Sequence, residues 1–428
     1  MRRRAPGRHF LHSRRNFRRG AQGVQPYQHH SSRVTCLHPL LVLPSHKRTT
    51  NAVPAPTLLQ IVPTLAGGGL ARATLDAAQA VVAAGGSAIV ASPGGGMVAD
   101  LLRLRATHLE LPNTRSRLTA RFAQPPKLAS SLRDAGIGLV QSRSPMTAWI
   151  ARALAKRLKV KWIATLHAPF AASDTLGRFV EGRQARADAV IAVSDHVARD
   201  ALARFPMLGE KLTVIPPGIN FDRFEPTLIR ADRLIRLTSE LRVPDGSHLI
   251  LCPARFEEDR GQKLLVEAMR LLRRDDVFCL LLGSNGRPTP FEKELEQAIE
   301  AAALHGRVQI GPYIDDMPAA YMLADVVVAT GGPRQGFSRT LIEAQAMGRP
   351  VVAEDGGGAA EAVRAGVTGW LTPAGDAKAM AEGLDSALAL SPERRAELAR
   401  TAQEHVRTRY SLAEANRRLL QLYERLTA

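Results

Sequence analysis

The sequence predicts an α/β protein with two parallel-sheet domains in tandem. From residue 57 onward, short apolar runs alternate with stretches of helix length. Such alternation is typical of βαβ units, which build parallel sheets. A charged stretch at 222–246 interrupts the alternation once. A chain of 428 residues is also long enough for two domains with separate cores. We therefore take 222–246 as the connection between two domains.

Each half repeats the same pattern of strands. In the first half they are predicted at 58–62, 88–91, 108–111, 137–140, 162–165, 190–193 and 212–215. In the second half they are predicted at 248–252, 277–282, 308–310, 325–329, 351–353 and 370–371. Three helical stretches end the chain, and the last, 412–426, has amphipathic spacing. Two Rossmann-like halves imply a deep cleft between them, which is the default position of a ligand site.

The net charge of +18 is distributed unevenly. Residues 1–56 hold eleven Lys or Arg, six of the twelve His and no acid, whereas 57–230 carry a net +10 and the remainder −3. We expect the first segment to be a basic, disordered arm. It fits a transit peptide, and it fits slightly better an over-called start codon, with folding beginning near Pro56. No apolar run approaches the roughly 20 residues that span a bilayer.

Two basic groups lie in the first half. They are Lys156, Arg157, Lys159 and Lys161, and Arg115, Arg117, Arg121 and Lys127. Aromatic residues make up only 5% of the chain, so stacking platforms for nucleic acid are scarce, and we expect no nucleic-acid partner. Anionic lipid headgroups or a phosphorylated acceptor fit better, beside the alternative of a plain solvated face.

The three cysteines form no C-x-x-C pattern. Cys252 and Cys279 fall in strand-like runs, which predicts reduced core residues in a cytosolic protein. Asp315-Asp316 is expected to cap a helix that begins at Met317.

A polar loop at 331–338 breaks directly into a helix that follows the predicted strand 325–329. This order places a helix N-terminus at the carboxyl edge of a sheet, where backbone N–H groups and the helix dipole attract phosphate. Glu343 lies about a turn and a half inside that helix, and Gln335 lies eight residues earlier in the loop. Both side chains could point into one cleft.

Three further segments follow strand ends. Arg255 and Arg260 are placed to clamp a diphosphate, although three adjacent acids fit a surface salt-bridge cluster equally well. The run 67–69 is three glycines, which let the backbone approach a ligand or form a flexible turn. His167 ends the run 162–166, where it would face the cleft or serve as a structural histidine.

Together these segments resemble the retaining GT-B glycosyltransferases of family 4, the glycosyltransferases group 1. The segment 331–352 resembles the family's E-x7-E block, and 192–195, 214–220 and 366–371 are further matches in the family's order. The run Ser142-Arg143-Ser144-Pro145 with Trp149 is similar to a bacterial subgroup of surface-polysaccharide and lipopolysaccharide assembly. The resemblance covers residues 57–428.

The resemblance implies a domain plan. After the arm at 1–56, an acceptor-side Rossmann-like domain would span 57–230 and a nucleotide-sugar-binding Rossmann-like domain 231–410. The helix at 411–428 would return to the first domain, so the C-terminal helices would cross back. The implied protein is cytoplasmic, at the inner face of the plasma membrane, and its basic first domain would contact anionic lipid.

The resemblance also implies an activity. A sugar, in a hexosyltransferase-like reaction, would pass with retained configuration from a nucleotide-sugar donor to a lipid-linked or polysaccharide acceptor, as in lipopolysaccharide or exopolysaccharide synthesis. No metal or other cofactor is expected, because arginines and a helix N-terminus supply the positive field. The implied catalytic residues are His167, Gln335 and Arg255. The implied donor-binding residues are Gly68, Gly69, Arg255, Arg260, Gly336, Phe337, Ser338 and Glu343, with Glu343 on the ribose.

Three positions depart from the family pattern. Gln335 replaces the first Glu of the block, Arg260 replaces a Lys, and Ala71 replaces an acid that commonly follows the glycines. A neutral amide can contact sugar hydroxyls but cannot stabilise a developing positive charge well. Two alternatives therefore stay open: a non-catalytic GT-B protein that binds a nucleotide sugar or a partner transferase, and a sugar-nucleotide epimerase.

Overall fold

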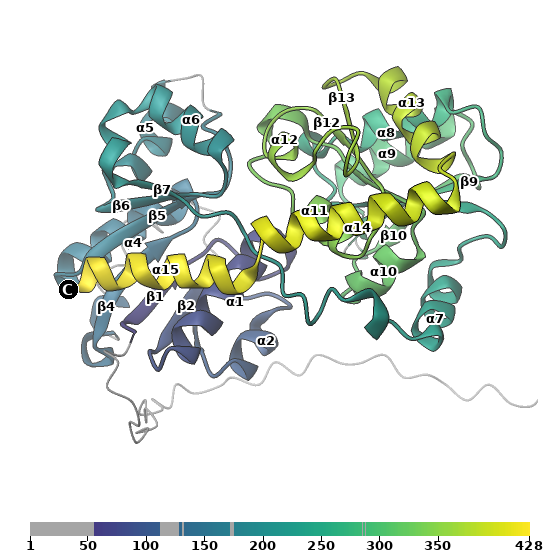
Figure 1. Cartoon of the computed structure of the whole chain (residues 1–428). Helices are drawn as coiled ribbons and strands as arrows, with labels where there is room; N and C mark the ends of the chain where they lie inside the picture. Colours follow the sequence, from purple (N-terminus) through teal and green to yellow (C-terminus); the bar gives the residue numbers. More distant parts are fainter. Residues whose placement is uncertain (1–54, 112–127, 131, 172–174, 285, 287) are drawn as a thin grey trace, which may run out of the picture. The chain divides into compact units, whose positions relative to one another are not determined.

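The computed structural model describes residues 55–111, 128–130, 132–171, 175–284, 286 and 288–428 (Figure 1). The predicted basic arm lies outside the described residues, apart from Ala55 and Pro56. Cys36 and the basic group at 115–127 also lie outside them.

The first sheet has seven parallel strands in the order β3-β2-β1-β4-β5-β6-β7. Their bounds are β1 Thr57–Ile61, β2 Ala88–Ser92, β3 Thr107–Glu110, β4 Ile137–Ser142, β5 Lys161–Leu166, β6 Ala189–Ala192 and β7 Leu212–Val214. β2, β4 and β6 are almost entirely buried, because helices cover both faces of a parallel sheet.

The second sheet has six strands in the order β10-β9-β8-β11-β12-β13, also all parallel. Their bounds are β8 His248–Pro253, β9 Val277–Ser284, β10 Val308–Pro312, β11 Val326–Ala329, β12 Val351–Glu354 and β13 Trp370–Thr372. Every predicted strand is found, with ends within two residues of the prediction. The predicted α/β architecture of two Rossmann-like domains is therefore confirmed.

Helices connect these strands. Around the first sheet they are α1 Gly68–Ala83, α2 Val98–Arg103, α4 Pro145–Leu158, α5 Thr175–Glu181 and α6 Asp195–Arg204. In the second half they are α7 Ala231–Leu241, α8 Gln262–Leu271, α9 Pro290–Ala301, α10 Met317–Leu323, α11 Arg339–Ala346, α12 Ala359–Ala362, α13 Ala377–Leu388, α14 Pro392–Arg409 and α15 Leu412–Thr427. α7 lies within the predicted connection, yet Leu237 and Leu241 pack into the core of the second domain.

Local sequence signals account for several helix starts. Ser144 and Thr147 form a capping box at α4, and Asp316 caps α10 as predicted. One start differs from the prediction. The glycine run 67–69 is predicted to form a close-approach loop or a flexible turn, but α1 begins at Gly68, so two of the three glycines belong to its first turn.

The chain crosses between the two domains twice, and the crossings lie side by side. The Ile219 N–H donates to the Tyr410 carbonyl at 2.7 Å, and the Leu412 N–H donates to the Ile219 carbonyl at 3.0 Å. A Cβ at Gly218 would lie 2.6 Å from the Leu412 nitrogen, so only glycine permits this approach.

The last two helices divide between the domains (Figure 1). α14 lies on the second domain, where the Gln403 amide donates to the Ala346 carbonyl at 3.2 Å. α15 buries Leu419, Leu422 and Tyr423 in the core of the first domain. The predicted return of the chain to the first domain is thus confirmed, and α15 alone makes it.

The cores contain two of the three cysteines. Cys252 and Cys279 are both free thiols and lie buried in one cluster of the second domain. Burial raises the pKa of the Cys252 thiol to about 12, so it behaves as a small apolar side chain. Within the part of the chain that the structure describes, no helix is long and apolar enough to cross a membrane.

Candidate active site

The strand orders indicate where a ligand would bind. In the first sheet the strand order reverses between β1 and β4: the chain runs outward from β1 to β2 and β3 on one side, and from β4 to β7 on the other. In the second sheet the same reversal lies between β8 and β11. In open parallel sheets, ligands bind outside the carboxyl ends of the strands at such a switch point. The segments that follow these four strands contain Gly68, Arg143, Arg255 and the loop 330–338. The predicted site residues therefore gather at these two edges, although they come from distant parts of the chain.

The two edges contact each other at Gly336. The Ser194 hydroxyl, at the start of α6, donates to the Gly336 carbonyl at 2.6 Å. A Cβ at Gly336 would lie 2.7 Å from the carbonyl carbon of His167 and 2.9 Å from Cα of Ala168. Both distances are shorter than a Cβ tolerates, so glycine is required for this approach. Gly336 thus joins the loop of the second domain to the segment after β5.

A second contact between the domains lies beside the first. The Glu361 carboxylate of α12 accepts hydrogen bonds from the backbone N–H groups of Asp195 at 3.0 Å and His196 at 2.6 Å. These groups belong to the first turn of α6, where an acidic side chain is favoured by the helix dipole. The His196 ring also bonds to the Pro333 carbonyl at 2.9 Å.

The two arginines of the predicted diphosphate clamp are paired with neighbouring acids. Arg255 pairs with Glu257 at 3.0 Å, and Arg260 pairs with the same carboxylate at 3.4 Å. The Arg255 side chain is 59% exposed, and exposed ion pairs stabilise by at most about 1 kcal/mol. A diphosphate could therefore replace Glu257 as their partner at little cost. A Cβ at Gly68 would lie 3.8 Å from Arg255 Cδ, which places the start of α1 beside this clamp.

Arg339 lies between the two domains at this site, although it was not singled out from the sequence. Its guanidinium contacts Asp76 of α1 at 3.0 Å and Glu343 at 3.3 Å, and it donates to the Gly218 carbonyl at 3.3 Å. All three side chains are 13–15% exposed. The network Asp76–Arg339–Glu343 therefore links the two domains through one buried cation. A Cβ at Gly69 would lie 3.5 Å from Arg339 Cδ, so Gly69 borders this network.

Glu343 is oriented from both sides. Its second oxygen accepts a hydrogen bond from the buried Tyr321 hydroxyl at 3.1 Å. With one oxygen on Arg339 and one on Tyr321, the carboxylate is held in a fixed orientation. An arginine four residues before Glu343 on one helix was a signal for this pair. No pattern linked either residue to Asp76, which is more than 260 positions away.

The loop residues divide into structural and accessible groups. The Ser338 hydroxyl caps α11 by accepting from the Leu341 N–H at 3.4 Å, and Phe337 packs against the cores of both domains. Glu354 holds the loop by accepting from the Gly331 N–H at 2.6 Å. The side-chain amide of Gln335 lies beside Gly331 and forms no hydrogen bond with any of the described residues. Glu343, by contrast, points to the buried network.

His167 lies at the carboxyl end of β5, as predicted. It lines a cavity of about 60 Å³ together with Asp76, Arg143 and Arg339. Burial, and then the nearby charge of Arg143, lower the pKa of His167 to about 3. The imidazole is therefore neutral at physiological pH, and it can exchange hydrogen bonds with a sugar but carries no charge of its own.

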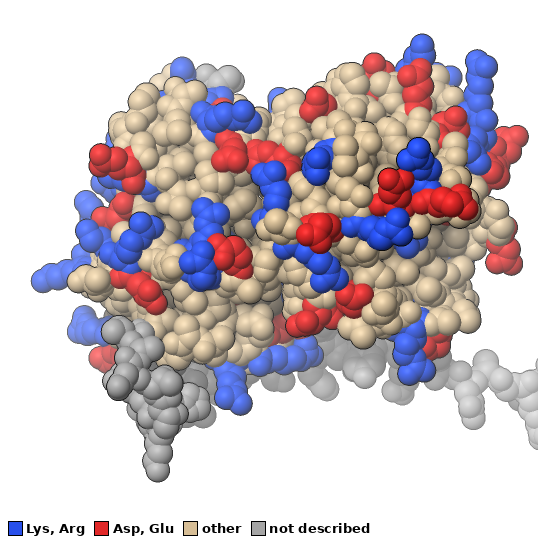
Figure 2. All heavy atoms as spheres, viewed as in Figure 1, with Lys and Arg blue, Asp and Glu red and all other residues tan. Residues whose placement is uncertain are grey.

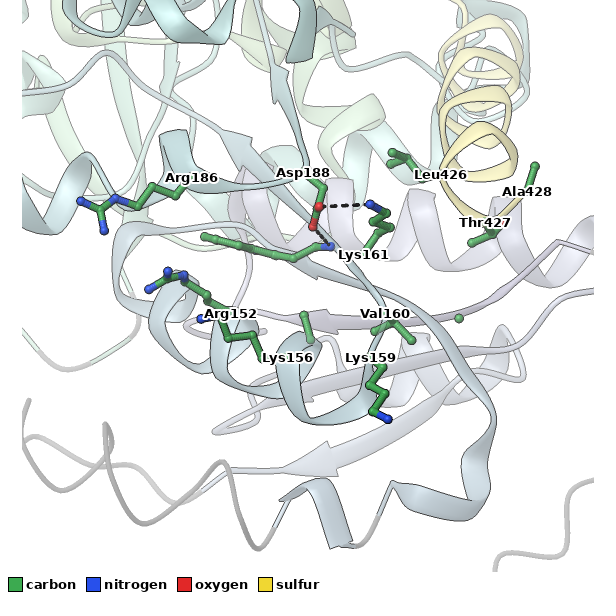
Figure 3. A pocket seen from close by; sticks show the side chains of 13 residues that line it. Arg152, Lys156, Lys159, Val160, Lys161, Arg186, Asp188, Leu426, Thr427 and Ala428 are labelled. Atoms are coloured by element: carbon green, nitrogen blue, oxygen red, sulfur yellow. Dashed lines mark hydrogen bonds and ion pairs between the residues drawn. The ribbon is translucent and has the colours of Figure 1, made fainter.

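A separate basic groove lies at the opposite edge of the first sheet. It has a volume of about 730 Å³ and is lined by Arg152, Lys156, Lys159, Lys161 and Arg186, with Asp188 as its acidic side chain (Figure 3). Lys161 begins β5 and Asp188 precedes β6, so the groove is at the amino ends of these strands. On the face drawn in Figure 2, by contrast, basic and acidic side chains are interspersed.

Comparisons with known proteins agree with this architecture. Residues 67–223 match the family described as Glycosyltransferase Family 4, and residues 236–405 match Glycosyl transferases group 1. The D-inositol 3-phosphate glycosyltransferase of Xylanimonas cellulosilytica is 32% identical over 66% of this chain and 70% of its own length. The lipopolysaccharide core biosynthesis mannosyltransferase LpsB of Rhizobium meliloti is 31% identical over 56% of this chain and 66% of its own length.

The solved structures show the same fold. Anabaena HepE in complex with UDP-glucose has a TM-score of 0.75 and 22% identity, with 87% of this chain and all of that chain covered. Each family match covers one of the two sheets: the family 4 match covers most of the first, and the group 1 match covers the second. The protein therefore belongs to the GT-B glycosyltransferases, with a family 4 domain followed by a group 1 domain.

Proposed function

We propose that this chain is a retaining, hexosyltransferase-like enzyme. It moves a sugar from a nucleotide donor to a lipid-linked or polysaccharide acceptor in lipopolysaccharide or exopolysaccharide synthesis. The observation that carries the proposal is the convergence of Arg255, Arg260 and the loop 331–338 at the β8/β11 switch point, opposite His167. LpsB by its name acts in lipopolysaccharide core synthesis, and HepE was solved with UDP-glucose.

Each residue has a role that fits its surroundings. Arg255 and Arg260 would exchange Glu257 for the donor diphosphate and neutralise the leaving group. Glu343, held by Arg339 and Tyr321, would accept hydrogen bonds from the ribose hydroxyls. The free amide of Gln335 and the neutral ring of His167 would contact the sugar. Backbone N–H groups at the start of α11 add positive potential, so we expect the chain to need no metal.

Binding of a nucleotide sugar is the direct test. We expect one of UDP-, GDP-, ADP- and dTDP-sugars to raise the melting temperature of the full-length protein and to be hydrolysed slowly, as followed by mass spectrometry. Arg255→Gln should weaken donor binding roughly 10- to 100-fold, the effect of about 1.5–3 kcal/mol for a hydrogen bond to a charged group. Arg270→Gln is the matched control, because Arg270 is an exposed arginine on α8 paired with Glu267.

Three outcomes separate the alternatives. If no nucleotide sugar binds, the proposal fails. Binding without hydrolysis, and without transfer when acceptor-containing membranes are added, supports a non-catalytic protein, which the neutral Gln335 favours. Release of a donor whose sugar is inverted at one carbon would indicate an epimerase.

We also propose that the basic groove of the first domain contacts anionic membrane. The side chains that line this groove include five cations and one acid, Asp188, so they carry a positive charge that attracts the anionic headgroups of phosphatidylserine. Because the groove is at the amino edge of the sheet, membrane bound there would leave the carboxyl edge uncovered. This contact would hold the protein at the inner face of the membrane, where a lipid-linked acceptor is presented.

Vesicle binding measures this contact. Lys156→Gln/Lys159→Gln should reduce co-sedimentation with phosphatidylserine vesicles by roughly 30-fold, since each lysine near the surface contributes about 1 kcal/mol. Binding should also weaken at high salt and be absent with phosphatidylcholine alone. Lys293→Gln/Lys378→Gln, two exposed lysines of the second domain, is the control. Equal losses in both double variants would contradict the groove as the contact.

A further inference from the structure

The side chain of Arg143 is buried in the first domain, and no carboxylate among the described residues is bonded to it. It is 5% exposed and follows β4 at the switch point. Its Nε donates to the Gln60 amide oxygen at 2.9 Å, and the Gln60 amide in turn donates to the Thr74 carbonyl at 3.0 Å. Among the described residues, nothing accepts a hydrogen bond from its two terminal nitrogens. The guanidinium is therefore anchored through Nε while its other donors stay unfilled.

These donors border the cavity of about 60 Å³ that His167 and Arg339 also line. The Nε2 atom of His167 is buried and has no hydrogen-bond partner among the described residues. A cavity needs only roughly 10–15 Å³ of such volume to hold one water, so this space also has room for a carboxylate or the end of a phosphate group. Two unfilled polar side chains thus face one small space beside the predicted position of the reacting sugar.

The nearby acids do not serve as partners for Arg143. Asp76 lines the same cavity, but its carboxylate is bonded to Arg339 at 3.0 Å. The network Asp76–Arg339–Glu343 carries a net charge of −1, which offsets the positive charge of Arg143 at longer range. None of its members accepts a hydrogen bond from Arg143. Burying an ion without direct partners costs several kcal/mol, and burial accordingly lowers the pKa of Arg143. A planar guanidinium with two free N–H edges is suited to a carboxylate or phosphate.

We propose that Arg143, together with His167, binds an anionic group, a carboxylate or phosphate monoester, carried by one of the two sugar substrates. The inference rests on the proposed function, because it takes His167 to lie at the reacting sugar. It adds a substrate class: either the donor sugar is acidic, or the acceptor carries an acidic or phosphorylated sugar. Arg143 then acts as a specificity-determining residue.

Calorimetry with paired ligands distinguishes the two sources. The donor pair is UDP-glucuronate and UDP-glucose, and the acceptor pair is glucose 6-phosphate and glucose in the presence of UDP. We expect the acidic member of one pair to bind the full-length protein at least about 10-fold more tightly than its neutral partner, the scale of one charge-assisted hydrogen-bonded contact. Arg143→Gln should abolish that preference, whereas Arg143→Lys should keep part of it.

UDP alone separates failure of this inference from failure of the proposed function. The UDP dissociation constant should stay within about twofold in Arg143→Gln, because the guanidinium faces the sugar side of the site. Arg143→Gln should also melt at or above the wild-type temperature, because the variant removes a buried charge. Arg236→Gln, an exposed arginine of α7, is the control.

Equal binding of acidic and neutral ligands, or a preference that persists in Arg143→Gln, would overturn the inference. Loss of UDP binding by the wild type would reject the proposed function itself.

Discussion

Arg339→Leu is expected to lower the free energy of unfolding by about 3–5 kcal/mol, the typical effect of removing one partner from a buried ion pair. The variant would leave Asp76 and Glu343 facing each other without the cation between them, and both are only 13–15% exposed. It should also raise the KM for the donor more than it lowers kcat, because Glu343, which we propose binds the ribose, would lose a contact that orients it. Denaturant unfolding and donor-dependent kinetics measure the two effects.

A triple variant tests whether charge is the reason. Asp76→Asn/Arg339→Leu/Glu343→Gln removes all three charges, so its stability should recover most of the loss seen in Arg339→Leu. Arg236→Leu, at an arginine 69% exposed on α7, should change stability by no more than about 0.5 kcal/mol. If Arg339→Leu proves as stable as wild type, the network does not link the domains as the contacts indicate.

Gly336→Ala is expected to reduce donor turnover roughly 100-fold, which is the scale of a 1 Å misplacement in an active site. The added methyl group would clash with the His167 carbonyl group, whose carbon would lie 2.7 Å away, and push the loop 331–338 away from the segment after β5. Each domain core should remain folded, since Gly336 contacts the other domain at its surface. The overpacking itself should cost about 1–3 kcal/mol.

The control for this variant is a glycine in open space. A Cβ at Gly209 would meet nothing within 4 Å, so Gly209→Ala should keep wild-type turnover and stability. Steady-state kinetics with a soluble donor and circular dichroism of both variants are the measurements. Wild-type turnover by Gly336→Ala would mean that the approach of the two edges is not needed for catalysis.

The elements were predictable because their signals are local. Each strand is a short apolar run bounded by turn residues, and a strand buried on both faces needs no partner to be recognised. The caps at Ser144 and Asp316 are equally local. The start of α1 at Gly68 was not predictable from propensity, because glycines weigh against a helix, whereas a first helical turn tolerates them when the following face is buried.

The candidate site was predictable only in part. The sequence placed Arg255, Arg260, His167 and the loop 331–338 after strands, and the structure brings those strand ends together. It could not indicate that Glu257 binds both arginines, or that the Ser338 hydroxyl caps α11. Such hydrogen bonds depend on side-chain directions, which no spacing along the chain specifies.

Strand and helix periodicity, motif order and the positions of strand ends were determined by the sequence alone, and from these the two-domain fold and family follow. Only the tertiary structure decided the contacts between the two edges: Asp76 with Arg339, Gly336 with His167, and the unfilled donors of Arg143. The physical reason is the distance along the chain over which each interaction acts. Periodicity and capping act over a few residues, whereas a buried charge finds its partner through packing of segments that can be more than 260 positions apart.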